Sequence, residues 1–253
     1  MKTIAVVAQK GGTGKTTTAH ALGAGLATRG LRTLLIDLDA QANLSYISRA
    51  DVREAGAFEV LTQRATADEA IQRHRGQLDI IAGGPSLAGA DLAITQAGKE
   101  YRLRDALQAL EKAYDVCVID TPPALGILTV SALTAATTAI VTAQADIFSL
   151  QAIGALAATV DAIRQHSNPA LTIGGILLTR YNPRTIISRD ISDMMKDAAA
   201  SLKTRIFKAR IRECTALKEA QAMKRDIFAY AKRSHAAKDY DDFIDELRKG
   251  ARI

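Results

Sequence analysis

A nine-residue segment near the start of the chain, QKGGTGKTT at positions 9–17, constrains the fold more than any other feature. It follows the apolar run Thr3–Ala8 and precedes a helical pattern over Thr16–Arg29. In such a strand–loop–helix unit, glycines let backbone N–H groups converge on phosphate oxygens, and the helix N-terminus adds the positive end of its dipole. The pattern places Lys15 against the β- and γ-phosphates and the Thr16 hydroxyl on Mg²⁺. A loop for Mg-ATP is predicted, with contacts from Gly11, Gly12, Thr13, Gly14, Lys15, Thr16 and Thr17.

The loop departs from the general pattern GxxxxGK[ST] at its first position. Gln9 stands where that pattern has glycine, and Lys10 follows directly. Lys10 is too far round the loop to serve its own phosphates easily. We therefore expect it to point outward, toward nucleotide held by another subunit. This interpretation makes the loop one half of a two-subunit site.

Short apolar runs alternate with longer helical patterns along the whole chain. This alternation, with nearly continuous apolar strands, predicts an α/β fold: a largely parallel, twisted sheet with helices on both faces. No repeat, low-complexity stretch or linker divides the sequence, so residues 1–253 are expected to form a single domain. The predicted strands are Thr3–Ala8, Thr33–Asp37, Leu78–Ala82, Asp115–Asp120, Thr138–Ala143 and Leu171–Leu178; the predicted helices include Thr16–Arg29, Tyr101–Lys112 and Leu150–Gln165.

The net charge of +6 is concentrated in the last third of the chain. Residues 180–253 carry 18 Lys and Arg against 11 Asp and Glu, whereas residues 1–179 carry 15 against 16. A basic surface confined to one part of a neutral protein suggests a polyanionic partner, although a solvated face with scattered lysines gives the same count. The apolar run after Met1 is too short for a signal peptide, so a cytoplasmic location is expected. Cys117 and Cys214 are expected to be reduced thiols.

The loop sequence KGGTGKTT resembles the deviant phosphate loop of the ParA/MinD ATPases, and the resemblance continues along the chain. Residues 35–43, LIDLDAQAN, are similar to the second acidic motif of ParA proteins. Residues 116–123, VCVIDTPP, are similar to their Walker B strand and switch. The stretches Gly174–Arg184 and Ile211–Ala220 resemble the base-binding region and a late segment of partition ATPases. The resemblance implies a P-loop NTPase fold and ATP hydrolysis.

Three aspartates carry the expected chemistry. Asp120 ends an apolar strand, so its carboxylate can reach Mg²⁺ through a coordinated water. The resemblance implies that Asp37 helps to hold the metal's water shell and that Asp39 orients the attacking water. A carboxylate near a γ-phosphate repels it, so slow turnover is expected. The resemblance also implies that Lys10 reaches the partner subunit's phosphates in an ATP-dependent homodimer, and that the base is bound near Thr179, Arg180, Ile211 and Arg212.

ParA relatives bind DNA non-specifically through basic residues of their C-terminal part, and the resemblance implies the same here. A homodimer on double-stranded DNA, nucleoid-associated and working with a ParB-like or adaptor partner, is therefore expected. Because the loop lies so near the start of this sequence, we expect no N-terminal helix-turn-helix domain, as in the small, Soj-like ParA proteins. The candidate DNA contacts are Arg184, Arg189, Lys203, Arg205, Lys208, Arg210, Lys224, Arg225, Lys232 and Arg233.

Several alternatives remain open from sequence. A MinD-like membrane ATPase would end in a basic amphipathic helix, but here the stripe Tyr240, Phe243, Ile244 and Leu247 has an acidic opposite face. We expect this stripe to pack on the domain and no stable membrane association. A reductase of the nitrogenase iron-protein type would need an exposed cysteine pair, and a bacterial tyrosine kinase would need a tyrosine-rich tail. The cargo can be a plasmid, a chromosome or a protein assembly.

Overall fold

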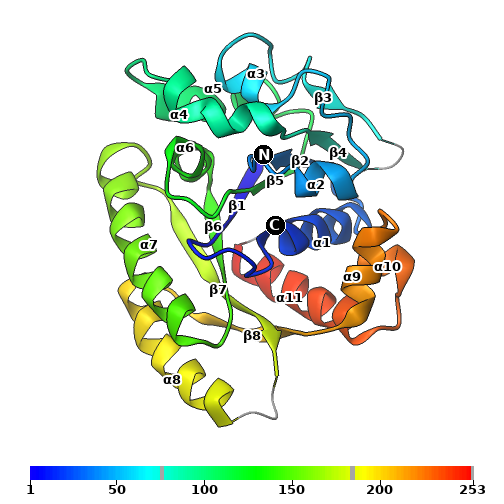
Figure 1. Cartoon of the computed structure of the whole chain (residues 1–253), viewed down its shortest axis with the longest axis vertical. Coiled ribbons are helices and arrows are strands. Elements are labelled where there is room, and N and C mark those ends of the chain that lie inside the picture. The colour runs from blue at the N-terminus through cyan, green and yellow to red at the C-terminus, as the bar shows by residue number, and fades with distance from the viewer. Residues whose placement is uncertain (75–76, 183–185, 252–253) are drawn as a thin grey trace.

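A computed structural model describes residues 1–74, 77–182 and 186–251, and within them the side chains of 186–193 and 251 are not described. This part of the chain forms one eight-stranded sheet in the order β3-β4-β2-β5-β1-β6-β7-β8 (Figure 1). Every neighbouring pair is parallel except β3 and β4. The strands are β1 (Lys2–Val7), β2 (Thr33–Asp37), β3 (Ile71–Gln72), β4 (Leu78–Ile81), β5 (Val116–Asp120), β6 (Thr138–Ala143), β7 (Thr172–Tyr181) and β8 (Ile206–Arg212).

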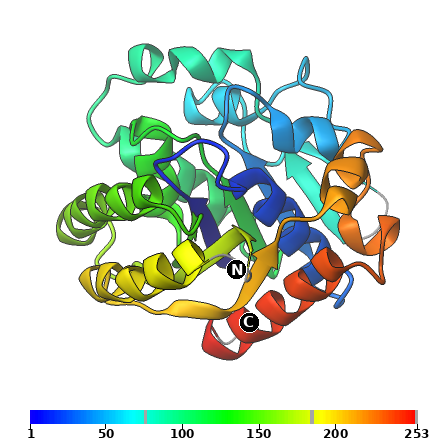
Figure 2. The same cartoon turned by 60° about the horizontal axis from the view of Figure 1, so that its bottom comes forward.

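Helices cover both faces of the sheet, as the continuous apolar strands predicted. One core lies under α3 to α8, and the other lies under α1, α2 and α9 to α11. Figure 2 shows α11 running along the outside of the sheet beside β8. The helices are α1 (Lys15–Ala27), α2 (Asn43–Ile47), α3 (Ala57–Leu61), α4 (Ala90–Ala93), α5 (Arg102–Gln108), α6 (Ile127–Ala135), α7 (Ile147–His166), α8 (Ile186–Ser201), α9 (Thr215–Ala222), α10 (Ile227–Tyr230) and α11 (His235–Ala251), with short 3₁₀ turns at Pro85–Gly89 and Lys99–Tyr101.

The six predicted strands are all present, with bounds that differ by up to three residues. Two strands were missed. β3 has only two residues, and β8 has the sequence IFKARIR, in which Lys208 and Arg210 were interpreted as part of a basic surface and Arg212 as a base-binding residue. Edge strands tolerate such charges because one side of the strand lacks a neighbour. The predicted helix Tyr101–Lys112 is shorter in the structure and ends at Gln108.

The C-terminal apolar stripe packs inside the molecule, as predicted. Tyr240, Phe243, Ile244 and Leu247 are each at most 2% exposed, and the Phe243 ring meets Phe207 of β8 edge-on. The long helix α7 is apolar and long enough to cross a membrane by length and composition alone. Its inward residues belong to the core, so in this fold α7 is a covering helix of the sheet.

Candidate nucleotide-binding site

The glycine loop lies at the carboxyl ends of the parallel strands, where such sheets bind ligands. Gly12 and Gly14 have φ values of 74° and 80°, in the left-handed region that favours glycine. Gly14 is the N-cap of α1, and no side chain caps that end. The free N–H groups of the first turn of α1 therefore remain available to an anion, because the helix itself leaves them without partners.

Three side chains from neighbouring segments hold the loop in place. Thr179 at the end of β7 donates its hydroxyl to the carbonyl oxygen of Thr13 at 2.7 Å. The hydroxyl of Thr13 meets that of Thr142 in β6 at 3.0 Å. Gln144 donates its side-chain amide to the carbonyl oxygen of Gly12 at 2.8 Å. These contacts fix the loop from the β6–β7 side, so Thr179 has a visible structural role besides the predicted contact with nucleotide.

Lys15 is the buried cation of the site. It is only 7% exposed, and its ammonium donates to the carbonyl oxygen of Lys10 at 3.3 Å. Burial lowers the pKa of Lys15, while the charges of Asp120 and Asp39 oppose that shift. A desolvated ammonium has lost much of its hydration and gains strongly from an anionic partner, which explains why this lysine suits a phosphate group.

Lys10 makes its ion pair within its own chain. Its ammonium is 2.6 Å from Asp146 Oδ2, and it lies 5.8 Å from the centroid of the exposed Phe148 ring. Asp146 also caps α7 by accepting the N–H of Ser149 at 2.8 Å. Burial raises the pKa of Asp146, but hydrogen bonds from Lys10 and Ser149 outweigh it, so the net shift is downward. The role of Lys10 toward a second subunit stays a prediction. Within its own chain, Asp146 would compete with the partner's phosphates for the Lys10 ammonium.

The second acidic motif has one buried and one accessible aspartate. Asp37, the last residue of β2, is fully buried, and its Oδ1 accepts the N–H of Asp39 at 3.0 Å. Asp39 is partly exposed and faces the phosphate loop, and its Oδ1 accepts the N–H of Gln41 at 3.0 Å. Asp39 is therefore accessible to a ligand, whereas Asp37 is buried and holds the backbone of Asp39 by a hydrogen bond.

Asp120 fits a magnesium site. It is fully buried at the end of β5 beside Asp37, and neither carboxylate oxygen has a hydrogen-bond partner in the described part of the chain. Burial and the charge of Asp37 raise the pKa of Asp120, while Thr16 and Lys15 lower it. Two buried carboxylate oxygens without donors are costly unless a cation and its waters complete them. Oxygen-only donors of this kind suit Mg²⁺.

A trench of about 520 Å³ runs along the phosphate loop, with Lys15 and Asp39 in its lining. Besides the loop and Asp39, it is lined by Tyr46 and Ile47 of α2, by Pro123, and by Gln221 and Ala222 of α9. Gln221 donates its amide to the Thr17 hydroxyl at 2.7 Å. Sequence reasoning missed the α2 and α9 residues because no local motif marks them; only the fold brings them to the loop.

Of the predicted base-binding residues, Thr179 contacts the loop, and none of the four lines this trench. Arg180 is exposed, has a φ of 49°, and pairs with Glu213 at 3.1 Å. Arg212 is bound to Asp239 at 2.6 Å, and the Ile211 side chain is buried in the core. Any base contact from Ile211 would therefore have to come from its backbone.

The ten candidate DNA contacts fall into three groups. Arg184 lies outside the described residues, and the side chain of Arg189 is likewise not described. Lys203, Lys208, Lys232 and Arg233 make no side-chain hydrogen bond or ion pair within the described residues. The other four are engaged within the chain: Arg205 with Glu246 (3.0 Å), Arg210 over the Tyr181 ring (4.4 Å), Lys224 over the Tyr46 ring (3.8 Å), and Arg225 with the Ala229 carbonyl oxygen (2.8 Å).

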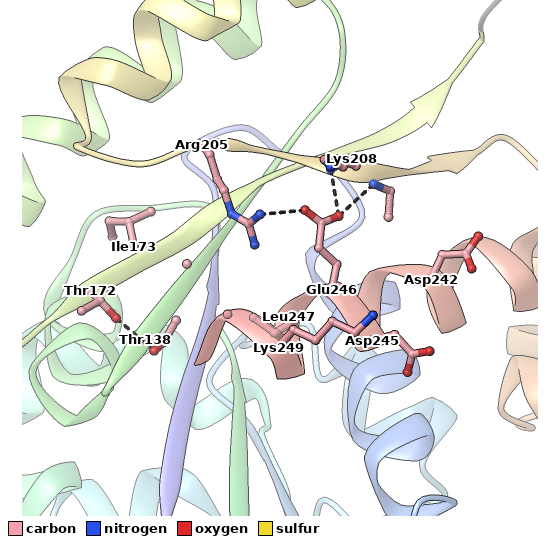
Figure 3. Close-up of a pocket in the computed structure, with 13 residues that line it drawn as sticks. Thr138, Thr172, Ile173, Arg205, Lys208, Asp242, Asp245, Glu246, Leu247 and Lys249 are labelled. Atoms are coloured by element: carbon pink, nitrogen blue, oxygen red, sulfur yellow. Dashed lines mark hydrogen bonds and ion pairs between the residues drawn. The ribbon is translucent and has the colours of Figure 1, made fainter. Parts of the chain in front are cut away.

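A groove of about 990 Å³ lies between β8 and α11 (Figure 3). Glu246 of α11 points across it, accepting the N–H groups of Lys208 and Ala209 and pairing with Arg205. Three cations and three carboxylates line this groove, so it is charge-balanced and offers no basic channel. Its charged lining residues are Arg205, Lys208, Asp242, Asp245, Glu246 and Lys249.

Known proteins are similar to this chain in sequence and in fold. A family model described as an AAA domain matches residues 1–173. The sporulation initiation inhibitor protein Soj of Bacillus subtilis is 35% identical over 251 residues, covering 97% of this chain and 98% of that protein. The chromosome partitioning protein ParA of Caulobacter vibrioides is 36% identical over 237 residues, covering 91% and 87%. A Mycobacterium smegmatis structure titled cobyrinic acid a,c-diamide synthase, with bound ADP and magnesium, is 31% identical with a TM-score of 0.86, covering 100% and 96%. The chain belongs to the ParA/MinD family of P-loop ATPases.

Proposed function

We propose that this ATPase works as a DNA partition or positioning switch, in which residues 1–253 act as one unit. Two copies hold Mg-ATP between them, bind DNA without sequence preference, and release it after slow hydrolysis. The observation that carries the nucleotide chemistry is the trench, which gathers the glycine loop, Lys15 and Asp39 beside the unpartnered carboxylate of Asp120. The partition role is supported by the relatives, two of which are named for sporulation control and chromosome partitioning.

Each residue has a distinct part in the proposed reaction. Lys15 and the N-terminus of α1 hold the β- and γ-phosphates, and Thr16 and Asp120 hold the metal and its waters, with Asp37 behind them. Bound Mg²⁺ neutralises phosphate charge. Asp39 orients the attacking water. A carboxylate there is repelled by the γ-phosphate, which favours slow turnover and suits a timer.

The proposed dimer depends on Lys10. Without a γ-phosphate, two loops and two Lys10 side chains would face each other without compensating charge, so association requires ATP. In the single chain Lys10 is satisfied by Asp146 instead. On dimerisation, the phosphates of the ATP bound by the partner therefore have to replace the Asp146 carboxylate as the anion paired with Lys10.

The proposed output is non-specific DNA binding on the nucleoid, in the cytoplasm, through the phosphate backbone. It is supported by the concentration of cations after residue 180, and four of the candidate DNA contacts among them have no side-chain partner within the described residues. A ParB-like or adaptor protein would stimulate hydrolysis and carry the cargo. That cargo is a plasmid or chromosome in the partition role and a protein assembly in the alternative positioning role.

Two active-site variants test the nucleotide chemistry. Lys15→Gln should lose nucleotide binding in a titration with fluorescent ATP. Asp39→Ala should still bind ATP, accumulate as the dimer and release phosphate about a hundredfold more slowly. Normal phosphate release from Asp39→Ala would refute the role assigned to Asp39.

A three-way binding assay tests the output. Wild-type protein with ATP, with ADP or without nucleotide is mixed with double-stranded DNA of two unrelated sequences, and separately with anionic liposomes. We expect DNA binding in ATP only, equal for both sequences and falling steeply with salt. Pelleting with liposomes but not DNA would instead identify a MinD-like membrane ATPase.

A further inference from the structure

The buried carboxylate of Asp37 is held by one residue that no motif marks. Its Oδ2 accepts both the backbone N–H and the hydroxyl of Ser45, each at 2.8 Å. Ser45 belongs to the short helix α2 and, like Asp37, is fully buried. Ser45 therefore ties α2 to the end of β2 through a single oxygen atom.

The same hydroxyl connects to a third segment. Ser45 Oγ accepts the N–H of Gly83, which follows β4, at 2.8 Å. A Cβ atom at Gly83 would lie 2.8 Å from the Asp37 carbonyl oxygen and 2.9 Å from its Cγ, distances that real Cβ atoms essentially never show. The ends of β2 and β4 and helix α2 thus meet at one hydroxyl, with no room for a side chain at Gly83.

Counting acceptors shows what remains for Asp37. Both lone pairs of Oδ2 are taken by Ser45, and one on Oδ1 is taken by the N–H of Asp39. The geometry leaves Asp37 one lone pair for a ligand's water, and its main task is to hold the backbone of Asp39. The position of Asp39 over the loop is in this way set by a chain of hydrogen bonds that starts at Gly83.

We propose that Ser45 is a positioning residue for ATP hydrolysis, which acts through Asp37 to fix Asp39, with Gly83 as its necessary neighbour. The inference rests on the role of Asp39 under Proposed function. This role is distinct from a general structural one because Ser45 contacts Asp37 of the acidic motif but does not line the trench proposed to hold the nucleotide. Loss of the hydroxyl should therefore disturb the chemical step more than nucleotide binding.

Ser45→Ala, Ser45→Thr and a matched control test this separation. Ser131 in α6 is also buried, but its hydroxyl has no partner among the described residues, so Ser131→Ala controls for loss of a buried hydroxyl. For Ser45→Ala we expect kcat to fall about tenfold to a hundredfold. The ATP dissociation constant should stay within about threefold of the wild-type value. Ser45→Thr keeps the hydroxyl and should recover most of kcat, and Ser131→Ala should match the wild type.

A second pair of variants approaches the network from β4. Gly83→Ala should lower kcat with ATP affinity retained, because its Cβ would displace Asp37. Gly89→Ala is the control, since a Cβ there meets nothing within 4 Å. This pair keeps the test open if Ser45→Ala folds poorly.

Hydrogen exchange gives a readout that does not depend on activity. In nucleotide-free Ser45→Ala the amide of Gly83 loses its acceptor, and its exchange should be about tenfold faster than in the wild type. Wild-type kcat in Ser45→Ala, equal losses of kcat and ATP affinity, or unchanged Gly83 exchange would each overturn the proposal. An active Asp39→Ala variant would instead refute the role of Asp39, while the Gly83 exchange would still report whether Ser45 holds the network.

Discussion

The two lysines of the phosphate loop are held in opposite ways. Lys15 is buried, its pKa is lowered by desolvation, and its nearest charges are carboxylates of the site. Lys10 keeps about a third of its side chain exposed and rests on Asp146, a residue that also caps α7. Exposed ion pairs contribute little, about 1 kcal/mol or less, so Lys10 can leave Asp146 at low cost. A readily broken pair is what a residue that must change partners requires.

This contact predicts the behaviour of an Asp146→Asn variant. Asparagine can still cap α7, but it no longer holds Lys10 by charge, so the ATP-dependent dimer should form about threefold to tenfold more tightly. Light scattering or sedimentation in ATP measures the change. Lys10→Ala should abolish the ATP-dependent dimer, and Asp161→Asn on the same helix should leave it unchanged. An Asp146→Asn dimer no tighter than the wild type would mean that this pair does not compete with association.

His20 in α1 predicts a pH dependence of folding. Burial lowers its pKa to about 4, with the charge of Asp226 opposing the shift. Unfolded histidine titrates near 6.5, so between these values the unfolded chain binds more protons and stability is lost as pH falls. Between pH 7.5 and 5 this group should remove about 2 kcal/mol of unfolding free energy. Urea unfolding should show that loss in wild type and in the exposed control His166→Gln, but not in His20→Gln.

At the scale of elements, α11 anchors the C-terminal region to the sheet. Its apolar stripe fills the core between α1 and β8, and its carboxylates Asp239 and Glu246 accept backbone N–H groups of that edge strand.

Phe243→Ala should therefore cost about 3–5 kcal/mol in unfolding free energy, measured by urea denaturation. Leu92→Ala, at a site 86% exposed, should change it by less than about 0.5 kcal/mol. Little loss in Phe243→Ala would imply that α11 is not part of the folded core.

Sequence predicted the elements whose own residues determine them. The central strands are nearly continuous apolar runs, and glycines mark the loop, so both could be located without the fold. β8 was missed because it is an edge strand whose cations resemble a surface loop. Ser45, Gly83 and Gln221 were missed for another reason: none belongs to a recognisable motif, and only the packing of α2, β4 and α9 brings them to the site.

For the whole molecule, the net charge describes the DNA surface less well than the pairing of each cation. The groove between β8 and α11 balances its cations with carboxylates, and Arg205 is held by Glu246. A paired arginine must give up its carboxylate before it meets a phosphate, whereas an unpaired cation releases only counterions. Lys232 and Arg233, in the turn before α11, have no side-chain partner within the described residues.

This difference predicts which variants weaken DNA binding. Replacing Lys232 and Arg233 together by alanine should weaken ATP-dependent DNA binding. The negative slope of log K against log salt should become shallower by about 0.9 for each lost phosphate contact. Lys2→Ala with Lys112→Ala removes the same charge from the opposite part of the sequence and should leave the slope unchanged. Arg205→Ala should have a smaller effect than the first pair. Fluorescence anisotropy over a salt series distinguishes these outcomes, and equal losses in both double variants would mean that net charge, and not this turn, governs DNA binding.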